Sequence, residues 1–273
     1  MPSLSFDSEN GKAVAYIKVS KEELKAKPEL KSFNNQVIYL HDDNLGVKEI
    51  SFDDLNIFPI FKFKENEKQN NRVSVFGKSG SGKSFIVGKI LDTLTSKKHG
   101  KQDREIVIVS GVDEDEALDK ERGPKSKKQL PERIDMYSPE FAEMSPEDFE
   151  DCILVFDDIE NLTNKAVNRT ALALRNSLLE KGRHKNIDVI TISHQAMGGN
   201  LTKFVHSEST GNFVFPAFSQ THQLNSYLTK YCGLSKTAIE KIVNLGETKS
   251  RWIYISNLAP MFVVYEKGIY LVK

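Results

Sequence analysis

The sequence predicts an α/β protein whose central sheet is mostly parallel and is flanked by helices. Three observations support this fold class. Short apolar stretches of strand length recur from residue 72 onward, and segments with helical spacing separate several of them. Two of the stretches, at 105–110 and 151–156, are largely apolar, as strands buried on both faces of a parallel sheet are. Polar residues follow several of these strands, at the edge where parallel sheets bind ligands.

Residues 1–70 are predicted to form a small β-rich appendage that precedes this α/β domain. Its expected elements are strands at 13–19 and 36–41, a short charged helical segment at 21–31, an apolar run around Pro59 and a polar linker at 64–71. The second predicted domain therefore comprises residues 71–273.

Strands and helices alternate in this second domain. The expected strands are 72–76, 105–110, 151–156, 187–192, 212–218, 251–255, 261–265 and 269–272, and the expected helices are a segment that follows residue 84, 162–181, 221–230 and 235–244. Gly182 is suited to end the helix at 162–181. Pro216 indicates that its strand lies at an edge of the sheet. Residues 111–132 are charged and contain Gly-Pro, so we expect an exposed, mobile loop.

The octapeptide Gly-Lys-Ser-Gly-Ser-Gly-Lys-Ser at residues 77–84 fits the pattern G-x-x-x-x-G-K-[ST] of loops that bind nucleotide phosphates. It lies between a predicted strand and a predicted helix, which is the order that such a P-loop requires. Glycines allow several backbone N–H groups to face one concave side, where they bind phosphate oxygens together with the positive end of the helix. The predicted phosphate-binding residues are Gly77, Lys78, Ser79, Gly80, Ser81, Gly82, Lys83 and Ser84.

Within this loop, Lys83 is expected to reach the β- and γ-phosphates, and the Ser84 hydroxyl is expected to bind Mg²⁺. The strand at 151–156 ends in a second group that fits this chemistry. Asp157 is predicted to hold Mg²⁺, directly or through water. Asp158 is predicted to orient or deprotonate the attacking water, and Glu160 is the alternative for that role. The sequence thus predicts ATP and Mg²⁺ as ligands.

The fourth strand ends in Ser193-His194-Gln195. An amide is both donor and acceptor, so Gln195 is predicted to sense the γ-phosphate and a water, with a simple cap of the strand end as the alternative. Side chains alternate along a strand, so we expect Ser193 and Gln195 to share a side. We expect His194 to face the other way and to be structural.

Arg183 follows Gly182 directly after the long helix. Arginine is suited to bidentate phosphate contacts, so Arg183 is a candidate arginine finger for a neighbouring subunit's site. An arginine that meets the helix dipole is an equally good interpretation. Arg169 and Arg175 are weaker candidates for the finger. The basic stretch 168–203 is interpreted as a solvated helix face rather than as a phosphate-binding surface.

Composition excludes several classes of protein. The formal net charge of zero gives no overall attraction to nucleic acid. No apolar run approaches the length of a bilayer span, and the N-terminus lacks a secretory pattern. The two cysteines, Cys152 and Cys232, lack the spacing of a metal site. We therefore expect a cytoplasmic protein without a membrane-spanning segment.

The chain resembles the FtsK/HerA superfamily of P-loop ATPases, and within it the genome-packaging ATPases of poxvirus-like and giant DNA viruses and of virophages. The resemblance covers residues 72–270 and rests on the glycine loop, the pair Asp157-Asp158, the Gly-Arg-His in the run 179–187, and the strand that ends in Gln195. It implies a P-loop NTPase fold of the ASCE type, in which the fourth strand lies between the first and third.

The resemblance also implies partners and a location. Its members are ring-shaped oligomers that pump double-stranded DNA and receive an arginine finger in trans, which maps onto Arg183 in this sequence. A homo-oligomeric ring, a pentamer or a hexamer, is therefore expected, and a capsid or portal-region protein is a further candidate partner. The place of action is then the host cytoplasm or the viral assembly site.

The function predicted is an ATP-hydrolysing translocase of double-stranded DNA that packages a viral genome into a capsid. One alternative is a nucleotide-binding scaffold of assembly without translocation. The other is a P-loop kinase for a nucleoside or nucleotide, with the loop 111–132 as a lid that carries Arg122 and Arg133. The acidic pair at 157–158 and Gln195 argue against the kinase.

Overall fold

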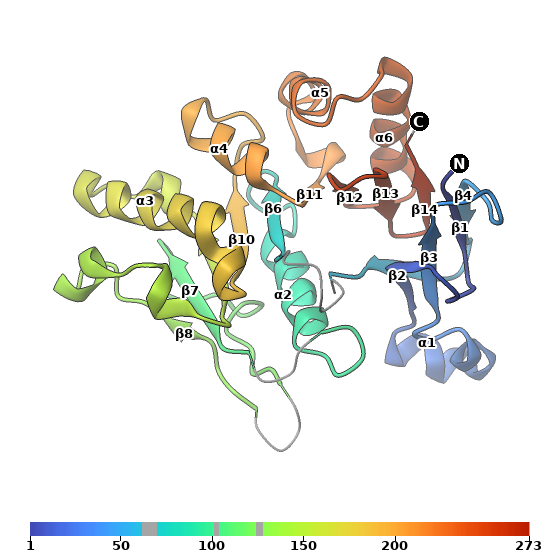
Figure 1. The fold of residues 1–273 in the computed structure, drawn as a ribbon, viewed down its shortest axis with the longest axis horizontal. Coiled ribbons are helices and arrows are strands. Elements are labelled where there is room, and N and C mark those ends of the chain that lie inside the picture. The colour runs from blue at the N-terminus through green and yellow to red at the C-terminus, as the bar shows by residue number, and fades with distance from the viewer. Residues whose placement is uncertain (62–69, 101–103, 124–127, 273) are drawn as a thin grey trace.

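A ten-stranded sheet is the core of the computed structural model, which describes residues 1–61, 70–100, 104–123 and 128–272 (Figure 1). The strand order is β4-β14-β13-β12-β11-β6-β10-β9-β7-β8. The strands of this sheet are β4 (Glu49–Ser51), β6 (Arg72–Phe76), β7 (Ile106–Ser110), β8 (Glu132–Arg133), β9 (Ile153–Asp157), β10 (Asp188–Ser193), β11 (Gly211–Val214), β12 (Ile253–Ser256), β13 (Phe262–Tyr265) and β14 (Gly268–Leu271).

One half of this sheet is parallel. The strands β11, β6, β10, β9, β7 and β8 pair side by side in the same direction. An antiparallel extension begins at β12 and continues through β13 and β14 to β4. The predicted α/β fold is confirmed. The strand order implied by the resemblance is also confirmed, because β10 lies between β6 and β9.

The helices are α1 (Lys21–Ala26), α2 (Lys83–Leu94), α3 (Lys165–Lys181), α4 (Asn200–Glu208), α5 (Thr221–Lys230) and α6 (Lys236–Thr248). Short 3₁₀ turns occupy Pro28–Ser32, Pro139–Glu143, Pro146–Phe149, Ile159–Asn161, Gly182–Lys185 and Pro216–Phe218. Gly182 caps the carboxyl end of α3, as predicted. In the described parts of the chain, no helix combines the length and the hydropathy that crossing a membrane requires.

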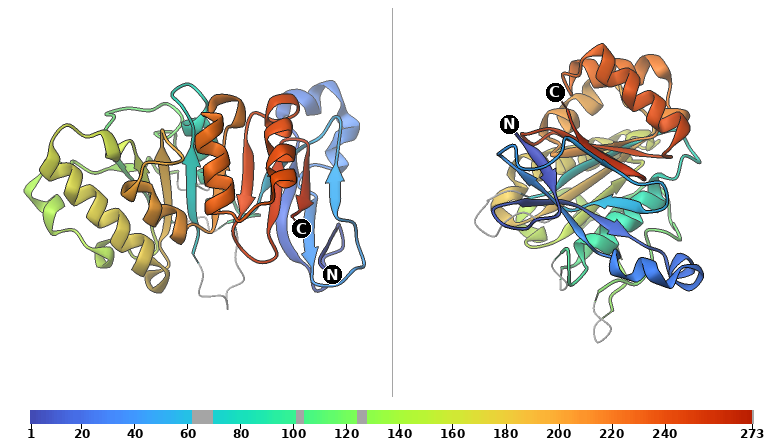
Figure 2. Two further views of the ribbon diagram at one scale, coloured as in Figure 1. Left: turned by 90° about the horizontal axis from the view of Figure 1, so that it is seen from above. Right: turned by 90° about the vertical axis from the view of Figure 1, so that its right-hand side faces the viewer.

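Helices cover both faces of the sheet (Figure 2). On one face, Ile90 of α2 belongs to the same apolar cluster as Val73 of β6 and Ile190 of β10. On the other face, Leu174 of α3 clusters with Val189, the neighbour of Ile190 along β10. Successive residues of a strand point to opposite faces, so a strand covered on both sides must be apolar throughout. This explains why β7 and β9 are nearly continuous apolar runs.

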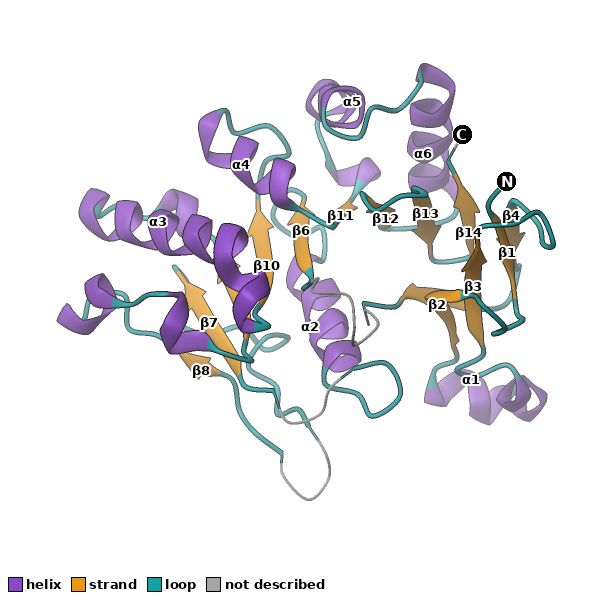
Figure 3. Cartoon of the chain, in the orientation of Figure 1, coloured by secondary structure: helices purple, strands orange, loops and turns teal. Residues whose placement is uncertain are grey.

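The N-terminal residues form a smaller antiparallel sheet beside α2 (Figure 3). Its strands, in spatial order, are β1 (Ser3–Ser5), β3 (Val37–His41), β2 (Lys12–Lys18) and β5 (Asn56–Pro59). Phe58 packs against Trp252 and Phe213 of the large sheet. Strand β4 leaves the small sheet and pairs with β14. The division of the chain at residue 70 stays a prediction.

The predicted edge position of Pro216 is wrong. The strand β11 ends at Val214, and Pro216 begins a 3₁₀ turn beyond it. Proline cannot donate a ladder hydrogen bond, so it stops the strand rather than marking an edge. β11 lies inside the sheet because the C-terminal strand β12 pairs with its other side.

The segment 111–132 forms a loop in the part that the structure describes, as predicted, and more than half of these residues are exposed, but two of them are buried and anchor the loop. Leu118 is fully buried, and the guanidinium of Arg122 is buried in an ion pair with Asp92 at 3.0 Å. Arg133 is held by Asp119 at 2.8 Å. These two arginines are therefore engaged, and neither is available as the lid residue of a kinase. Most of the predicted linker at 64–71 lies outside the described residues.

Candidate nucleotide-binding site

The glycine loop connects the end of β6 to the start of α2, at the carboxyl edge of the parallel strands. Its first N–H, that of Gly77, donates to the carbonyl of Ser193 at the end of β10, at 3.2 Å. Gly80 and Gly82 adopt φ values of +74° and +102°, which favour glycine. A Cβ on Gly77 would lie 2.6 Å from the Ser81 hydroxyl, so a side chain does not fit there. The loop conformation therefore depends on its glycines.

The backbone donors of this loop fit a phosphate ligand. The N–H groups of Ser79, Gly80 and Gly82 donate to no acceptor among the residues that the structure describes. The first N–H groups of α2, from Lys83 onward, have no partner inside the helix. Unpaired donors that converge at a helix N-terminus bind anions, because the partial positive charge of the helix dipole adds to them.

Lys83 lies folded against this loop. Its ammonium donates to the carbonyls of Gly77 and Lys78, at 2.9 and 3.1 Å, and lies 3.5 Å from Nδ1 of His194. Burial lowers the pKa of Lys83, whereas the nearby Asp157 and Asp158 raise it. The cation, the loop and the two acids are thus close enough to interact.

Asp157 is the last residue of β9 and is 8% exposed. Its register pairs it with Ser110 of β7, whose hydroxyl donates to Oδ2 at 3.2 Å. Burial raises the pKa of Asp157, the Ser110 hydrogen bond lowers it, and the charge of Asp158 raises it again. A positive ligand that compensates for this burial would favour the ionised carboxylate.

The site fits a Mg²⁺ ion that the protein and the nucleotide phosphates bind together. Within the described ranges, no group of three or more His, Cys, Asp or Glu side chains is placed to hold a metal ion. Magnesium usually keeps several waters and binds one or two carboxylates plus substrate phosphates. Asp157 and the Ser84 hydroxyl are the side chains that would hold it here.

Asp158 adopts a left-handed backbone conformation, with φ +54°. One of its carboxylate oxygens, Oδ1, accepts from Nδ2 of Asn161 at 2.8 Å and lies 3.0 Å from Nε2 of His194. Asp158, which the sequence predicts to position the water, is therefore held by both Asn161 and His194.

Glu160 is engaged with two other residues. Its Oε1 pairs with Arg175 at 3.0 Å, and its Oε2 accepts from the Ser193 hydroxyl at 2.7 Å. Arg175 is 1% exposed, and burial lowers the pKa of its guanidinium. The pair ties α3 to the tip of β10.

Removing the Glu160 carboxylate should destabilise the fold. We expect Glu160→Ala to lower the free energy of unfolding by about 3–5 kcal/mol, because it leaves a buried arginine charge without this partner. Urea denaturation measures the effect, and Glu180→Ala, at an exposed position of α3, is the matched control. A loss below about 1 kcal/mol, as exposed ion pairs give, would contradict the structural role of Glu160.

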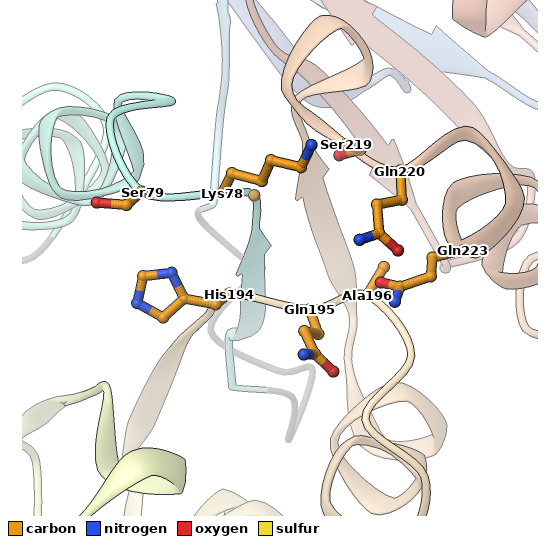
Figure 4. A pocket seen from close by; sticks show the side chains of 9 residues that line it. Lys78, Ser79, His194, Gln195, Ala196, Ser219, Gln220 and Gln223 are labelled. Carbon is orange, nitrogen blue, oxygen red and sulfur yellow. The ribbon is translucent and has the colours of Figure 1, made fainter.

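Gln195 follows β10 and faces a cavity of about 220 Å³ beside the glycine loop (Figure 4). The cavity is lined by Gly77, Lys78, Ser79, His194, Gln195, Ala196, Ser219, Gln220 and Gln223. In Figure 4 the side chains of His194 and Gln195 leave the chain in different directions. The structure thus brings Gln195 next to the predicted phosphate loop, and it also places His194, which we expected to be structural, in contact with Lys83 and Asp158.

Arg251 is a site residue that the sequence does not reveal. Its guanidinium donates to the carbonyls of Ser81 and Gly80, at 2.8 and 3.0 Å, and lies over the ring of Phe218. It therefore braces the outer face of the glycine loop. No motif surrounds it, and it lies about 170 residues further along the chain, so only the folded structure identifies it.

Arg183 lies in the 3₁₀ turn that precedes β10 and is exposed, with Nε 3.4 Å from Nε2 of His184. Lys83 and Asp157 lie at the opposite, carboxyl edge of the sheet. Within one chain, Arg183 therefore lies away from the candidate site. Arg175, one of the two weaker candidates for a finger, is buried in its pair with Glu160.

The fold and the site together define a P-loop nucleoside triphosphatase, in which a glycine loop, a lysine and a strand-end carboxylate meet at the carboxyl edge of a parallel sheet. Residues 61–211 match the family model of the central domain of the helicase HerA. This match spans more than half of the chain, which therefore belongs to the HerA central-domain family. The resemblance to the FtsK/HerA superfamily is thus confirmed.

One curated relative is the uncharacterized protein V3 of the Sputnik virophage, which is 35% identical over 123 residues. That match covers 44% of this chain and 49% of the relative, so the chain spans about half of the relative's length.

Solved structures give partial likenesses. TcpA, the pCW3 conjugation coupling protein in a monomer form with ATPγS, has a TM-score of 0.42 and 12% identity over 99% of this chain and 87% of its own. ATPases 2 and 3 of EssC from Geobacillus thermodenitrificans have a TM-score of 0.39 and 11% identity over 80% of this chain and 41% of their own. The fold assignment rests on the strand order and the glycine loop.

Proposed function

We propose that this protein hydrolyses ATP and uses the energy to translocate double-stranded DNA, in order to package a viral genome into a capsid. The observation that carries the proposal is the meeting of the glycine loop, Lys83 and the acidic pair Asp157-Asp158 at one edge of the sheet. Membership of the HerA family supports a DNA translocase, and the virophage relative supports a viral setting.

The binding step uses the charged and polar groups of the loop. Lys83 exchanges the carbonyls of Gly77 and Lys78 for the β- and γ-phosphates. The free N–H groups of the loop donate hydrogen bonds to the remaining phosphate oxygens. Ser84 and Asp157 would hold Mg²⁺, which would neutralise charge on the phosphates.

In the hydrolytic step, Asp158, Gln195 and Arg183 each have one role. Asp158 orients the attacking water and takes its proton, because both oxygens of Glu160 are engaged elsewhere. Gln195 contacts the γ-phosphate and reports its loss. Arg183, which lies at the opposite edge of its own sheet, enters the site of a neighbouring subunit.

An arginine finger that acts in trans requires a neighbouring copy of the chain. We infer a homo-oligomeric ring around double-stranded DNA, docked to a capsid or portal-region protein during assembly. Lys203, an exposed residue of α4, lies shortly after the strand tip that carries Gln195. Loss of the γ-phosphate at Gln195 is then transmitted to the segment Gly198 to Lys203, in which Lys203 contacts DNA phosphates.

Long double-stranded DNA should stimulate ATP hydrolysis by the assembled ring. Phosphate release, measured with and without DNA over a range of salt concentrations, tests this. Lys203→Gln should weaken the stimulation and lower the salt dependence of DNA binding by about one phosphate contact. Lys236→Gln, at a fully exposed position of α6, is the matched control with the same loss of charge.

An assembled ring that hydrolyses ATP without response to DNA would refute translocation. Tight nucleotide binding with negligible turnover would instead support the scaffold. Transfer of phosphate to a nucleoside or nucleotide, rather than to water, would support the kinase.

A further inference from the structure

The side chain of His194 connects two residues of the nucleotide site. Its Nδ1 lies 3.5 Å from Nζ of Lys83, and its Nε2 lies 3.0 Å from Oδ1 of Asp158. The three side chains come from α2, from the end of β10 and from the turn after β9. The imidazole therefore lies between the cation and the second acid of the site.

The two contacts select one form of the ring. A lysine ammonium only donates hydrogen bonds, so Nδ1 faces it with a lone pair. An ionised carboxylate only accepts, so Nε2 must carry the hydrogen that is donated to Asp158. A neutral imidazole with its hydrogen on Nε2 satisfies both neighbours.

The contact with His194 also determines how Asp158 presents its carboxylate. Oδ1 interacts with both Asn161 and His194. Among the described residues, Oδ2 has no hydrogen-bond partner. Two donors on one oxygen fix the rotation of the carboxylate about its χ2 angle, and they leave the other oxygen free to accept a proton.

The backbone at Asp158 makes this support necessary. Its left-handed conformation, with φ +54°, is sparsely populated by residues other than glycine, although aspartate and asparagine tolerate it better than most. Such conformations persist where surrounding contacts hold them, and they concentrate at active sites. His194 and Asn161 are the side chains that supply these contacts at Asp158.

We propose that His194 is a positioning residue for hydrolysis, which holds Asp158 with Oδ2 directed toward the attacking water and which joins Asp158 to Lys83 before nucleotide binds. The inference rests on the proposed ATP hydrolysis. In that step the water oxygen bonds to the terminal phosphorus, the bond from phosphorus to the bridging oxygen breaks, and ADP leaves with the electron pair. The proton of the water passes to Oδ2 of Asp158.

Substitutions of His194 separate positioning from binding. His194→Ala removes the donor to Asp158 and should lower kcat about 10²-fold, the cost of a misplaced reacting group, with KM for ATP changed less than about twofold. His194→Gln carries an amide donor at a reach similar to that of Nε2 and should recover most of this loss. His222→Gln, at an exposed position of α5, is the matched control and should keep the wild-type kcat.

Equal kcat values for the alanine and glutamine variants would overturn the proposal. A change in KM with kcat unaltered would overturn it too, because His194 would then contribute to binding alone.

A spectroscopic test needs neither nucleotide nor DNA. Long-range ¹H–¹⁵N spectra of the nucleotide-free protein report the tautomer of each of the six histidines, and His194→Gln assigns the signals of His194. The expected form is neutral with hydrogen on Nε2. Asp158→Asn and Lys83→Ala should each shift the ring nitrogens of His194 and leave those of His222 in place.

Signals of His194 that neither substitution shifts would refute the bridge between Lys83 and Asp158. This outcome is independent of the DNA experiment. A ring without DNA stimulation, in which the two variants still shift His194 and glutamine still rescues alanine, would refute translocation and leave the role of His194 intact.

Discussion

Replacement of Lys83 by alanine is expected to reduce ATP hydrolysis at least ~10²–10³-fold, the range for loss of a single group that stabilises developing charge. Lys83 is the cation that the loop holds over its own carbonyls, and it lies close enough to Asp157 and Asp158 for their charges to affect its pKa. Without it, the charge that develops between the β- and γ-phosphates loses the cation that the glycine loop supplies. Phosphate release at saturating ATP measures the loss of hydrolysis. Binding of a fluorescent ATP analogue measures the effect on nucleotide affinity.

The fold should survive this substitution. Lys83 donates to two carbonyls of the glycine loop and is not part of the apolar core, so the unfolding midpoint should change little. Lys97→Ala, at an exposed position beyond the end of α2, removes the same charge and should leave hydrolysis unaltered. Near-normal hydrolysis by Lys83→Ala would show that the glycine loop is not the catalytic phosphate site.

Replacement of Arg183 by alanine is expected to cost about 10³–10⁵ in kcat, the range of arginine fingers supplied in trans. The reason is its position. Arg183 is exposed in the 3₁₀ turn that precedes β10, and Lys83 and Asp157 lie at the other end of the same group of strands. If Arg183 contributes to hydrolysis, it must therefore act in the site of a neighbouring subunit.

Mixing two inactive variants tests this arrangement. A ring that contains both Arg183→Ala and Lys83→Ala subunits has interfaces at which an intact Lys83 faces an intact Arg183. We expect hydrolysis to recover in the mixture although each variant alone is inactive. Lys165→Ala, at an exposed position of α3, removes the same charge and is the control. Full activity of Arg183→Ala alone would favour the other interpretation, an arginine that meets the dipole of α3.

Much of the site was predictable because its signals are contiguous in the sequence. Gly77, Gly80 and Gly82 follow an apolar strand and precede a helix, so one segment specifies both the loop and its surroundings. Asp157 was predictable for the same reason, because it ends a buried strand. The parallel sheet followed from apolar runs that only two-sided burial explains.

The sequence failed to predict features that depend on distant segments. Pro216 by itself indicates an edge strand, but the strands that continue the sheet past β11 lie about forty residues later in the sequence. The charged segment at 111–132 is a largely exposed loop, as its composition indicates, but composition does not reveal that Leu118 and Arg122 are buried against α2 and its surroundings. Local composition carries no information about such partners.

The sequence by itself determined the kind of ligand. The glycine loop with its lysine is one contiguous segment, and the strand that ends in an acidic residue is another, so each is specified by its own local residues. Only the tertiary structure decided which side chains meet around that ligand. It placed His194 between Lys83 and Asp158, engaged Glu160 with Arg175, braced the loop with Arg251 and put Arg183 at the far edge of the sheet. The physical reason is that hydrogen bonds and ion pairs form between atoms a few ångströms apart in space, and chain folding sets those distances independently of the separation in sequence.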